Sequence, residues 1–128
     1  MTNKSKIPVP SESKEQIALF YWARLNVSSI PELGLLFSIP NGGYRTPSTA
    51  ARMKAEGERA GVPDCFLPIP RGRYSGLWIE LKRLRGSKID PLQKWWAERL
   101  SAQGYAHVFA YGWEEAVKAI ETYLSGQF

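Results

Sequence analysis

The segment Leu77–Lys82, which reads LWIELK, is the stretch of this sequence that most directly decides the fold. Every second residue is aliphatic, and a tryptophan, a glutamate (Glu80) and a lysine (Lys82) lie between them. Side chains along a β-strand alternate between its two faces, so this pattern predicts a strand from Leu77 to Arg83 with one apolar face. Glu80 and Lys82 then share the other face, about 7 Å apart.

A second strand-like run, Cys65–Ile69, precedes this segment, although its proline at position 68 weakens the far end. The glycine-rich basic stretch Arg71–Gly76 separates the two runs and is typical of a turn. The pattern therefore predicts a β-hairpin. Asp64 lies directly ahead of the first run, so the hairpin would place Asp64 beside Glu80.

Further elements are expected on both sides of the hairpin. A strand is predicted over Leu35–Ile39, with a turn at 40–43, and another over Tyr105–Tyr111. Helices are predicted from Ser11 to about Asn26, from Pro47 to Gly57 or Gly61, from Pro91 to about Gln103, and over Trp113–Leu124. In the first helix the spacing predicts an apolar face made of Ile17, Phe20, Tyr21 and Leu25. This order indicates a single α/β layer structure.

Length and composition exclude several classes of protein. The 128 residues, 44% hydrophobic and 23% charged, suit one globular domain over 11–128, with residues 1–10 as a flexible leader. No apolar run approaches the roughly 18 residues of a membrane span, and the start lacks the features of a signal peptide. One cysteine and one histidine exclude an internal disulfide and a structural zinc set. We expect a soluble, cytoplasmic protein.

The net charge of +5 is concentrated in one part of the chain. Between positions 71 and 88 lie six basic residues and one acid, Glu80, so that this window alone carries +5. A localised basic excess is typical of a binding site for a polyanion. The alternative is a solvated loop, strand and loop with no ligand.

The pairing of Asp64 with Glu80 points to metal chemistry. Two carboxylates held together repel each other unless a cation lies between them. Oxygen ligands on a basic background favour a hard ion such as Mg²⁺, with phosphate completing its shell. Lys82 could then orient a water or stabilise charge on the phosphate, which predicts phosphodiester hydrolysis. The alternative is an exposed strand on which Glu80 and Lys82 pair weakly.

Asp64 followed by Glu80-Leu81-Lys82 resembles the signature of the PD-(D/E)xK nucleases. The surroundings are more specific and resemble the VRR-NUC subgroup, in its stand-alone phage and bacterial form. The resemblance rests on Ile39–Gly43, Gly57 with Ala60–Asp64, Ile79–Lys82, and Gln93. It implies a restriction-endonuclease-like α/β fold, with a mixed central sheet of about four strands flanked by helices.

The resemblance also implies roles for individual residues. Asp64 and Glu80 correspond to the carboxylates that bind Mg²⁺ or Mn²⁺, with the Leu81 carbonyl as a further ligand, and Lys82 corresponds to the catalytic lysine. A glutamate of the first helix completes the site in the family. Glu12 fits the family's E-x-x-x-Q pattern, and Glu15 is a competitor one helical turn away.

Gln93 has two interpretations. In the family, a glutamine at the start of the helix after the ExK strand reaches into the site. Locally, Asp90-Pro91-Leu92-Gln93 is also typical of a capping box, with Gln93 reaching back to the N-cap residue Asp90.

Other polar and aromatic residues suit supporting roles. Trp95 and Trp96 are adjacent in a helix, so we expect one in the core and one at an interface. His107 and Cys65 are expected in the core. Candidate contacts to DNA are Asn41, Arg45, Arg71, Arg73, Arg83, Arg85 and Lys88.

The resemblance favours a structure-specific endonuclease that acts on branched DNA such as a Holliday junction. Symmetric cleavage of a four-way junction needs two active sites, which predicts a homodimer. The alternatives are a less selective nuclease that nicks duplexes or trims flaps, and a non-catalytic nucleic-acid-binding module.

Overall fold

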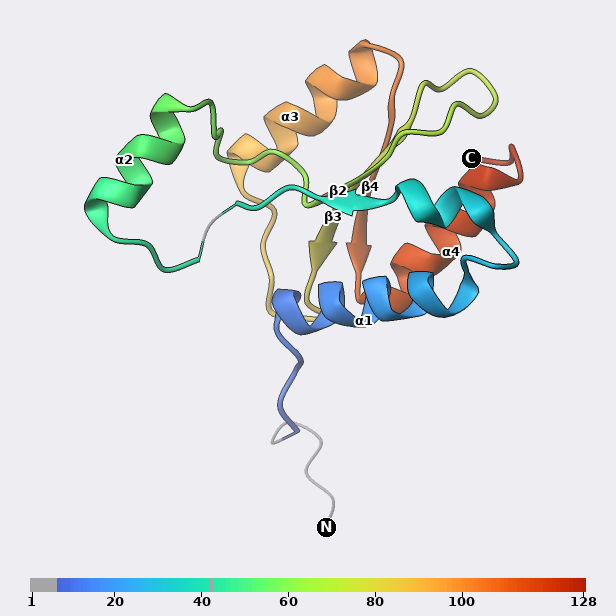
Figure 1. Cartoon of the computed structure of the whole chain (residues 1–128), viewed down its shortest axis with the longest axis horizontal. Coiled ribbons are helices and arrows are strands. Elements are labelled where there is room, and N and C mark those ends of the chain that lie inside the picture. The colour runs from blue at the N-terminus through green and yellow to red at the C-terminus, as the bar shows by residue number, and fades with distance from the viewer. Residues whose placement is uncertain (1–6, 42) are drawn as a thin grey trace.

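The computed structural model describes residues 7–41 and 43–128 (Figure 1). Most of the expected leader, and Gly42 in the expected turn, lie outside the described residues. The elements follow in the order α1 (Glu12–Asn26), the 3₁₀ helix η2 (Pro31–Leu35), β1 (Phe37–Ser38), α2 (Pro47–Ala55), β2 (Cys65–Leu67), β3 (Leu77–Lys82), α3 (Pro91–Ala102), β4 (Ala106–Tyr111) and α4 (Trp113–Leu124).

The four strands form one mixed sheet in the order β1-β2-β3-β4. β1 pairs with β2 and β2 with β3 in antiparallel fashion, whereas β3 and β4 run parallel. Parallel neighbours need a crossover connection, and α3 supplies it. The predicted α/β class, the hairpin and the mixed four-stranded sheet are therefore confirmed.

The alternation of β3 assigns its two faces to different neighbours. Leu77, Ile79 and Leu81 are fully buried, in a core that includes Leu19 of α1 and Ile120 of α4. The opposite face carries Trp78, Glu80 and Lys82, and the amino-terminal part of α3 lies over it. The apolar face therefore holds the sheet to α1 and α4, while the other face is left for polar groups.

The predicted apolar face of α1 is wrong. The buried residues of this helix are Glu15, Leu19 and Ala23, whereas Ile17 and Tyr21 are more than half exposed. Leu25 is likewise exposed, and Phe20 packs only partly against the core. Two rows of side chains on α1 therefore have helical spacing, the predicted apolar row and the row of Glu15, Leu19 and Ala23. The second row packs against the protein, and the small Ala23 allows close approach.

Two strands are shorter than expected, and α2 stands apart. Residues 31–35 form a 3₁₀ helix instead of leading into a strand, so β1 has only two residues. β2 ends before Pro68, as the lost N–H donor of proline requires.

None of the residues of α2 is buried, and Figure 1 shows the helix projecting from the rest of the molecule. Within the described residues, no helix is long and apolar enough to cross a membrane.

Candidate active site

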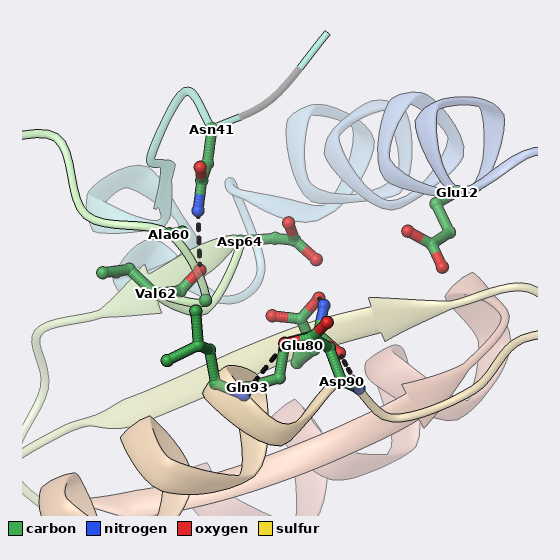
Figure 2. A pocket seen from close by; sticks show the side chains of 10 residues that line it. Glu12, Asn41, Ala60, Val62, Asp64, Glu80, Asp90 and Gln93 are labelled. Carbon is green, nitrogen blue, oxygen red and sulfur yellow. Dashed lines mark hydrogen bonds between the residues drawn. The ribbon is translucent and has the colours of Figure 1, made fainter. Parts of the chain in front are cut away.

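The hairpin brings Asp64 and Glu80 together. Cys65 of β2 pairs with Ile79 of β3, so the residue before one and the residue after the other lie at the same end of the hairpin. The backbone N–H of Leu81 donates to Asp64 Oδ2 at 2.8 Å, which fixes the aspartate carboxylate against β3. Both carboxylates line a pocket of about 320 Å³, together with Glu12, Asn41 and Gln93 among others (Figure 2).

The carboxylates of Asp64 and Glu80 repel each other when both are ionised and no cation lies between them. Glu80 is 3% exposed, and burial, followed by the charge of Asp64 and a hydrogen bond with it, raises the pKa of Glu80 from 4.5 to about 9. Burial also raises the pKa of Asp64, partly offset by the N–H of Leu81. At neutral pH the pair therefore holds a proton that a cation could replace.

Lys82 and Gln93 connect the pair to the following loop and helix. Lys82 Nζ donates to the carbonyl of Lys88 at 2.8 Å and to Gln93 Oε1 at 2.7 Å. Gln93 Nε2 in turn donates to Glu80 Oε2 at 3.2 Å. The glutamine therefore bridges the lysine and the buried glutamate.

Gln93 also takes part in a capping box. Its Oε1 accepts from the N–H of Asp90 at 3.0 Å, while the Asp90 side chain accepts from the N–H of Leu92 at 2.8 Å. The two interpretations of Gln93 therefore hold together in one conformation. The cap places the first turn of α3 at the pocket and so fixes where the glutamine points.

The two glutamates of α1 have different environments. Glu12 lines the pocket, where Figure 2 shows its side chain reaching toward the carboxylate pair, and its Oε2 accepts from Ser87 Oγ at 3.3 Å. Glu15 is 4% exposed and accepts from the N–H of Trp113 at 3.0 Å, at the start of α4. The geometry therefore favours Glu12 as the helix carboxylate and gives Glu15 a capping role.

The donor set suits a hard divalent cation. Asp64, Glu80 and Glu12 offer carboxylate oxygens around one pocket. A strand residue directs its N–H and C=O to the same side, and the N–H of Leu81 points to Asp64. The pairing of β2 with β3 extends only to Ile79, so the Leu81 carbonyl also faces the side of Asp64 without a partner strand there. Over the described ranges, no three Asp, Glu, His or Cys side chains are already gathered as a metal cluster. The buried pair is thus the preformed part, and Glu12 lies nearby.

The basic residues of the window from 71 to 88 divide between the two ends of the hairpin. Arg83, Arg85 and Lys88 follow β3 at the carboxylate end, and Arg85 and Lys88 are exposed. Arg71 and Arg73 lie in the turn at the other end, where they line a separate hollow with Tyr74. The structure thus separates Arg71 and Arg73 from the pocket.

Asn41 and Arg45 lie on the loop between β1 and α2. Asn41 lines the pocket and donates at 3.4 Å to the carbonyl of Val62 (Figure 2). Arg45 forms an ion pair with Glu58, in which both side chains are largely buried. Asn41 therefore lies beside the carboxylates, whereas the charge of Arg45 is already partnered.

Sequence reasoning missed the residues that hold the site together through backbone groups. Ser87 accepts from the N–H of Arg83 at 3.0 Å and links the loop after β3 to Glu12. The carbonyl of Lys88 holds Lys82. The sequence could have indicated Ser87, because it is a polar side chain in a glycine-containing loop. It could not have indicated the carbonyl of Lys88, because every residue has a backbone carbonyl.

The four residues assigned to core or interface roles have mixed outcomes. Cys65 is fully buried, as expected. His107 is only half-buried and lies outside the core cluster, so the expectation for it is wrong, although burial lowers its pKa to about 4 and keeps it neutral. The expectation that one tryptophan of α3 lies in the core is wrong, because Ala97 is the residue of that helix that is buried. Trp96 is half-buried and donates to the carbonyl of Ala60 in the loop before β2, whereas Trp95 is exposed.

The sheet order and the Asp64, Glu80 and Lys82 arrangement define a protein of the restriction-endonuclease-like α/β class. A search of solved structures found a VRR_NUC domain protein that superposes with a TM-score of 0.77. It is 27% identical in sequence, and the match covers 94% of this chain and 93% of that chain. No family model and no curated protein matches the sequence. The structural match, over nearly the whole of both chains, supports a VRR-NUC domain.

Proposed function

We propose that this chain is a metal-dependent DNA endonuclease that hydrolyses phosphodiester bonds in branched DNA such as Holliday junctions. The observation that carries the proposal is the buried Asp64 and Glu80 pair, with Lys82 bridged to it through Gln93. Two carboxyl groups buried side by side in a pocket are costly for a fold, so they indicate a function. The similarity to a VRR_NUC domain protein supports nuclease chemistry as that function.

Asp64, Glu80, Glu12 and the Leu81 carbonyl would hold Mg²⁺ or Mn²⁺. When bound, such an ion polarises a phosphoryl oxygen and lowers the pKa of a coordinated water. The carboxylates hold their positions without help from substrate, because Leu81 fixes Asp64 and Gln93 fixes Glu80. This arrangement costs little reorganisation when DNA arrives.

Lys82 would stabilise charge at the scissile phosphate. An ammonium group has three N–H donors, and the carbonyl of Lys88 and Gln93 Oε1 take two of them. The third can donate to an attacking water or to a phosphate oxygen. Because the lysine is 3% exposed, its charge is screened little by solvent and acts strongly at short range.

The basic residues at the carboxylate end would bind the flanking phosphates. Arg85 and Lys88 are exposed on the loop that ends at Asp90, a residue that lines the pocket. Such contacts give affinity and salt dependence without reading sequence. A chain of this size presents one active site, so symmetric cutting of a four-way junction requires a homodimer.

A cleavage assay tests this proposal. The purified chain is mixed in parallel with a four-way junction, a flap and a linear duplex, with Mg²⁺ or with excess chelator, and Asp64→Asn serves as the inactive control. We expect Mg²⁺-dependent cleavage that is fastest on the junction. Equal rates on all three DNAs would instead indicate the less selective nuclease, and cleavage in excess chelator would remove the metal from the mechanism.

The two glutamates of α1 provide a matched pair of variants. Glu12→Gln should raise the Mg²⁺ concentration needed for half-maximal cleavage by about tenfold or more, with the melting temperature little changed. Glu15→Gln should lower the melting temperature, because it removes the negative charge that Glu15 places at the amino end of α4, beside the N–H of Trp113. Metal titrations and thermal melts of both variants check this assignment, which the reverse pattern would overturn.

A further inference from the structure

An exposed apolar surface on α3 lies next to the candidate active site and has no part in the chemistry above. Leu92 is 49% exposed and Trp95 is 41% exposed. Together with Trp96 and Arg59 they line a hollow of about 510 Å³, which we call the Trp95 platform. Single exposed apolar side chains are ordinary, but aromatic and aliphatic groups gathered around one hollow indicate a contact surface.

The Trp95 platform is continuous with the catalytic pocket. Ala60 and Leu92 line both hollows. Trp96 Nε1 donates to the carbonyl of Ala60 at 3.1 Å, which fastens α3 to the loop that leads to Asp64. Gly61 has φ +88°, and a Cβ there would meet the Leu92 Cβ at 2.7 Å. This close packing holds the platform at a set position relative to the carboxylates.

The charges around the platform are those that a nucleic acid would meet. The Arg99 guanidinium lies 5.0 Å from the ring centre of Trp95, and that of Arg59 lies 5.4 Å from the ring centre of Trp96. Lys94 and Glu98 are also exposed on α3 and offset each other. The two arginines therefore leave the platform positive, with aromatic surface between them.

We propose that the Trp95 platform binds an unpaired nucleobase of the DNA substrate. The base stacks against the Trp95 indole, and Arg59 and Arg99 contact the adjacent phosphates. Stacking on an aromatic side chain is strong and independent of sequence, because every base has a π-face. This inference rests on the proposed function and deepens it, because it requires a base at the branch point of the DNA to be unpaired in the complex, close to the phosphate that is cut.

Binding measurements without cleavage test the stacking. In the Asp64→Asn background with chelator present, fluorescence anisotropy compares a duplex that has a short single-stranded arm with the same duplex whose arm carries abasic sugars. Adding Trp95→Ala should weaken binding of the base-bearing arm about tenfold and binding of the abasic arm little, because only the former loses a stacked base. Trp95→Phe should restore most of the affinity.

Phe128→Ala is the matched control, because Phe128 is also an aromatic side chain that is 41% exposed but lines a hollow with Tyr74 and Tyr123. It should bind both arms like the parent protein. Equal weakening of both arms by Trp95→Ala, or no weakening, overturns the inference even where wild-type protein cleaves DNA with Mg²⁺. Base-dependent binding by a wild-type protein that never cleaves would instead overturn the proposed function and leave the platform standing.

Discussion

The two ends of the β2–β3 hairpin carry basic residues from the same stretch of sequence but use them differently. At the turn end, Arg71 pairs with Glu32 and Arg73 lies 5.1 Å from the ring centre of Tyr74. At the carboxylate end, Lys82 is held against Gln93, and Arg85 is exposed beyond it. The turn end thus ties segments of the protein together, while the carboxylate end presents charge to a pocket.

Charge density along a sequence therefore does not by itself locate a binding surface. A hairpin folds a basic window in two and separates residues that are close in the chain. Variants at the two ends should therefore behave differently.

The largest expected effect is on cleavage at the carboxylate end. Lys82→Ala and Asp64→Asn should each lower the rate of Mg²⁺-dependent cleavage at least about a hundredfold. The first removes a positive charge beside the reacting phosphate, and the second removes a charged metal ligand. DNA binding should remain. Arg73→Ala, at the turn end, should cleave at the wild-type rate. Single-turnover cleavage rates check this, and a Lys82→Ala protein that still cuts at the wild-type rate would mean that the site is misplaced.

The next effect is a pH dependence of stability that comes from the carboxylate end. Glu80 has a pKa raised to about 9, so its stabilising contribution in the metal-free protein is complete below pH 4.5 and is lost as the pH rises through 9. In EDTA, the melting temperature of the wild type should fall by several degrees from pH 6 to pH 9 relative to Glu80→Gln.

Mg²⁺ should reverse that loss, because binding favours the ionised pair. Arg71→Ala, which changes only the turn end, should keep the wild-type slope of melting temperature against pH. Parallel curves for the wild type and Glu80→Gln in EDTA would show that the buried glutamate is not the titrating group.

The sequence carried enough information for the carboxylate end. Alternation in β3 and the pairing of two short strands depend on neighbours a few residues apart, and these placed Asp64, Glu80 and Lys82 together. The capping box at Asp90 was equally local.

The turn end and α1 were not predictable in the same way. The partner of Arg71 is Glu32, which comes from a distant 3₁₀ helix, and no local pattern indicates that contact. In α1, two stripes have helical spacing, and only the packed sheet decides that Leu19 is buried while Tyr21 is exposed. Tertiary packing therefore made both decisions.

A smaller effect is expected on DNA affinity. Arg85→Ala should weaken binding several-fold and lower the slope of log affinity against log salt by about 0.9, the value for one lost phosphate contact. Arg73→Ala should leave the slope unchanged, because the turn end lies away from the pocket. Salt titrations of both variants check the comparison. An equal change in slope for both would mean that DNA contacts the two ends alike.

The smallest effect should come from Arg71, and it should be on stability alone. Arg71 donates to Glu32 Oε2 at 2.6 Å and to the carbonyl of Leu124 at 3.2 Å, so it connects the hairpin turn to η2 and to the end of α4. The ion pair is about one-third exposed, which limits its worth, and the hydrogen bond to Leu124 adds to it. Arg71→Ala should therefore lower the free energy of unfolding by about 1 kcal/mol in urea titrations.

Glu32→Ala should lower the free energy of unfolding by no more than this, because it leaves the hydrogen bond from Arg71 to Leu124 intact. Cleavage by both variants should match the wild type. A loss of DNA affinity in Arg71→Ala without a loss of stability would assign the turn end to binding and erase the contrast between the two ends.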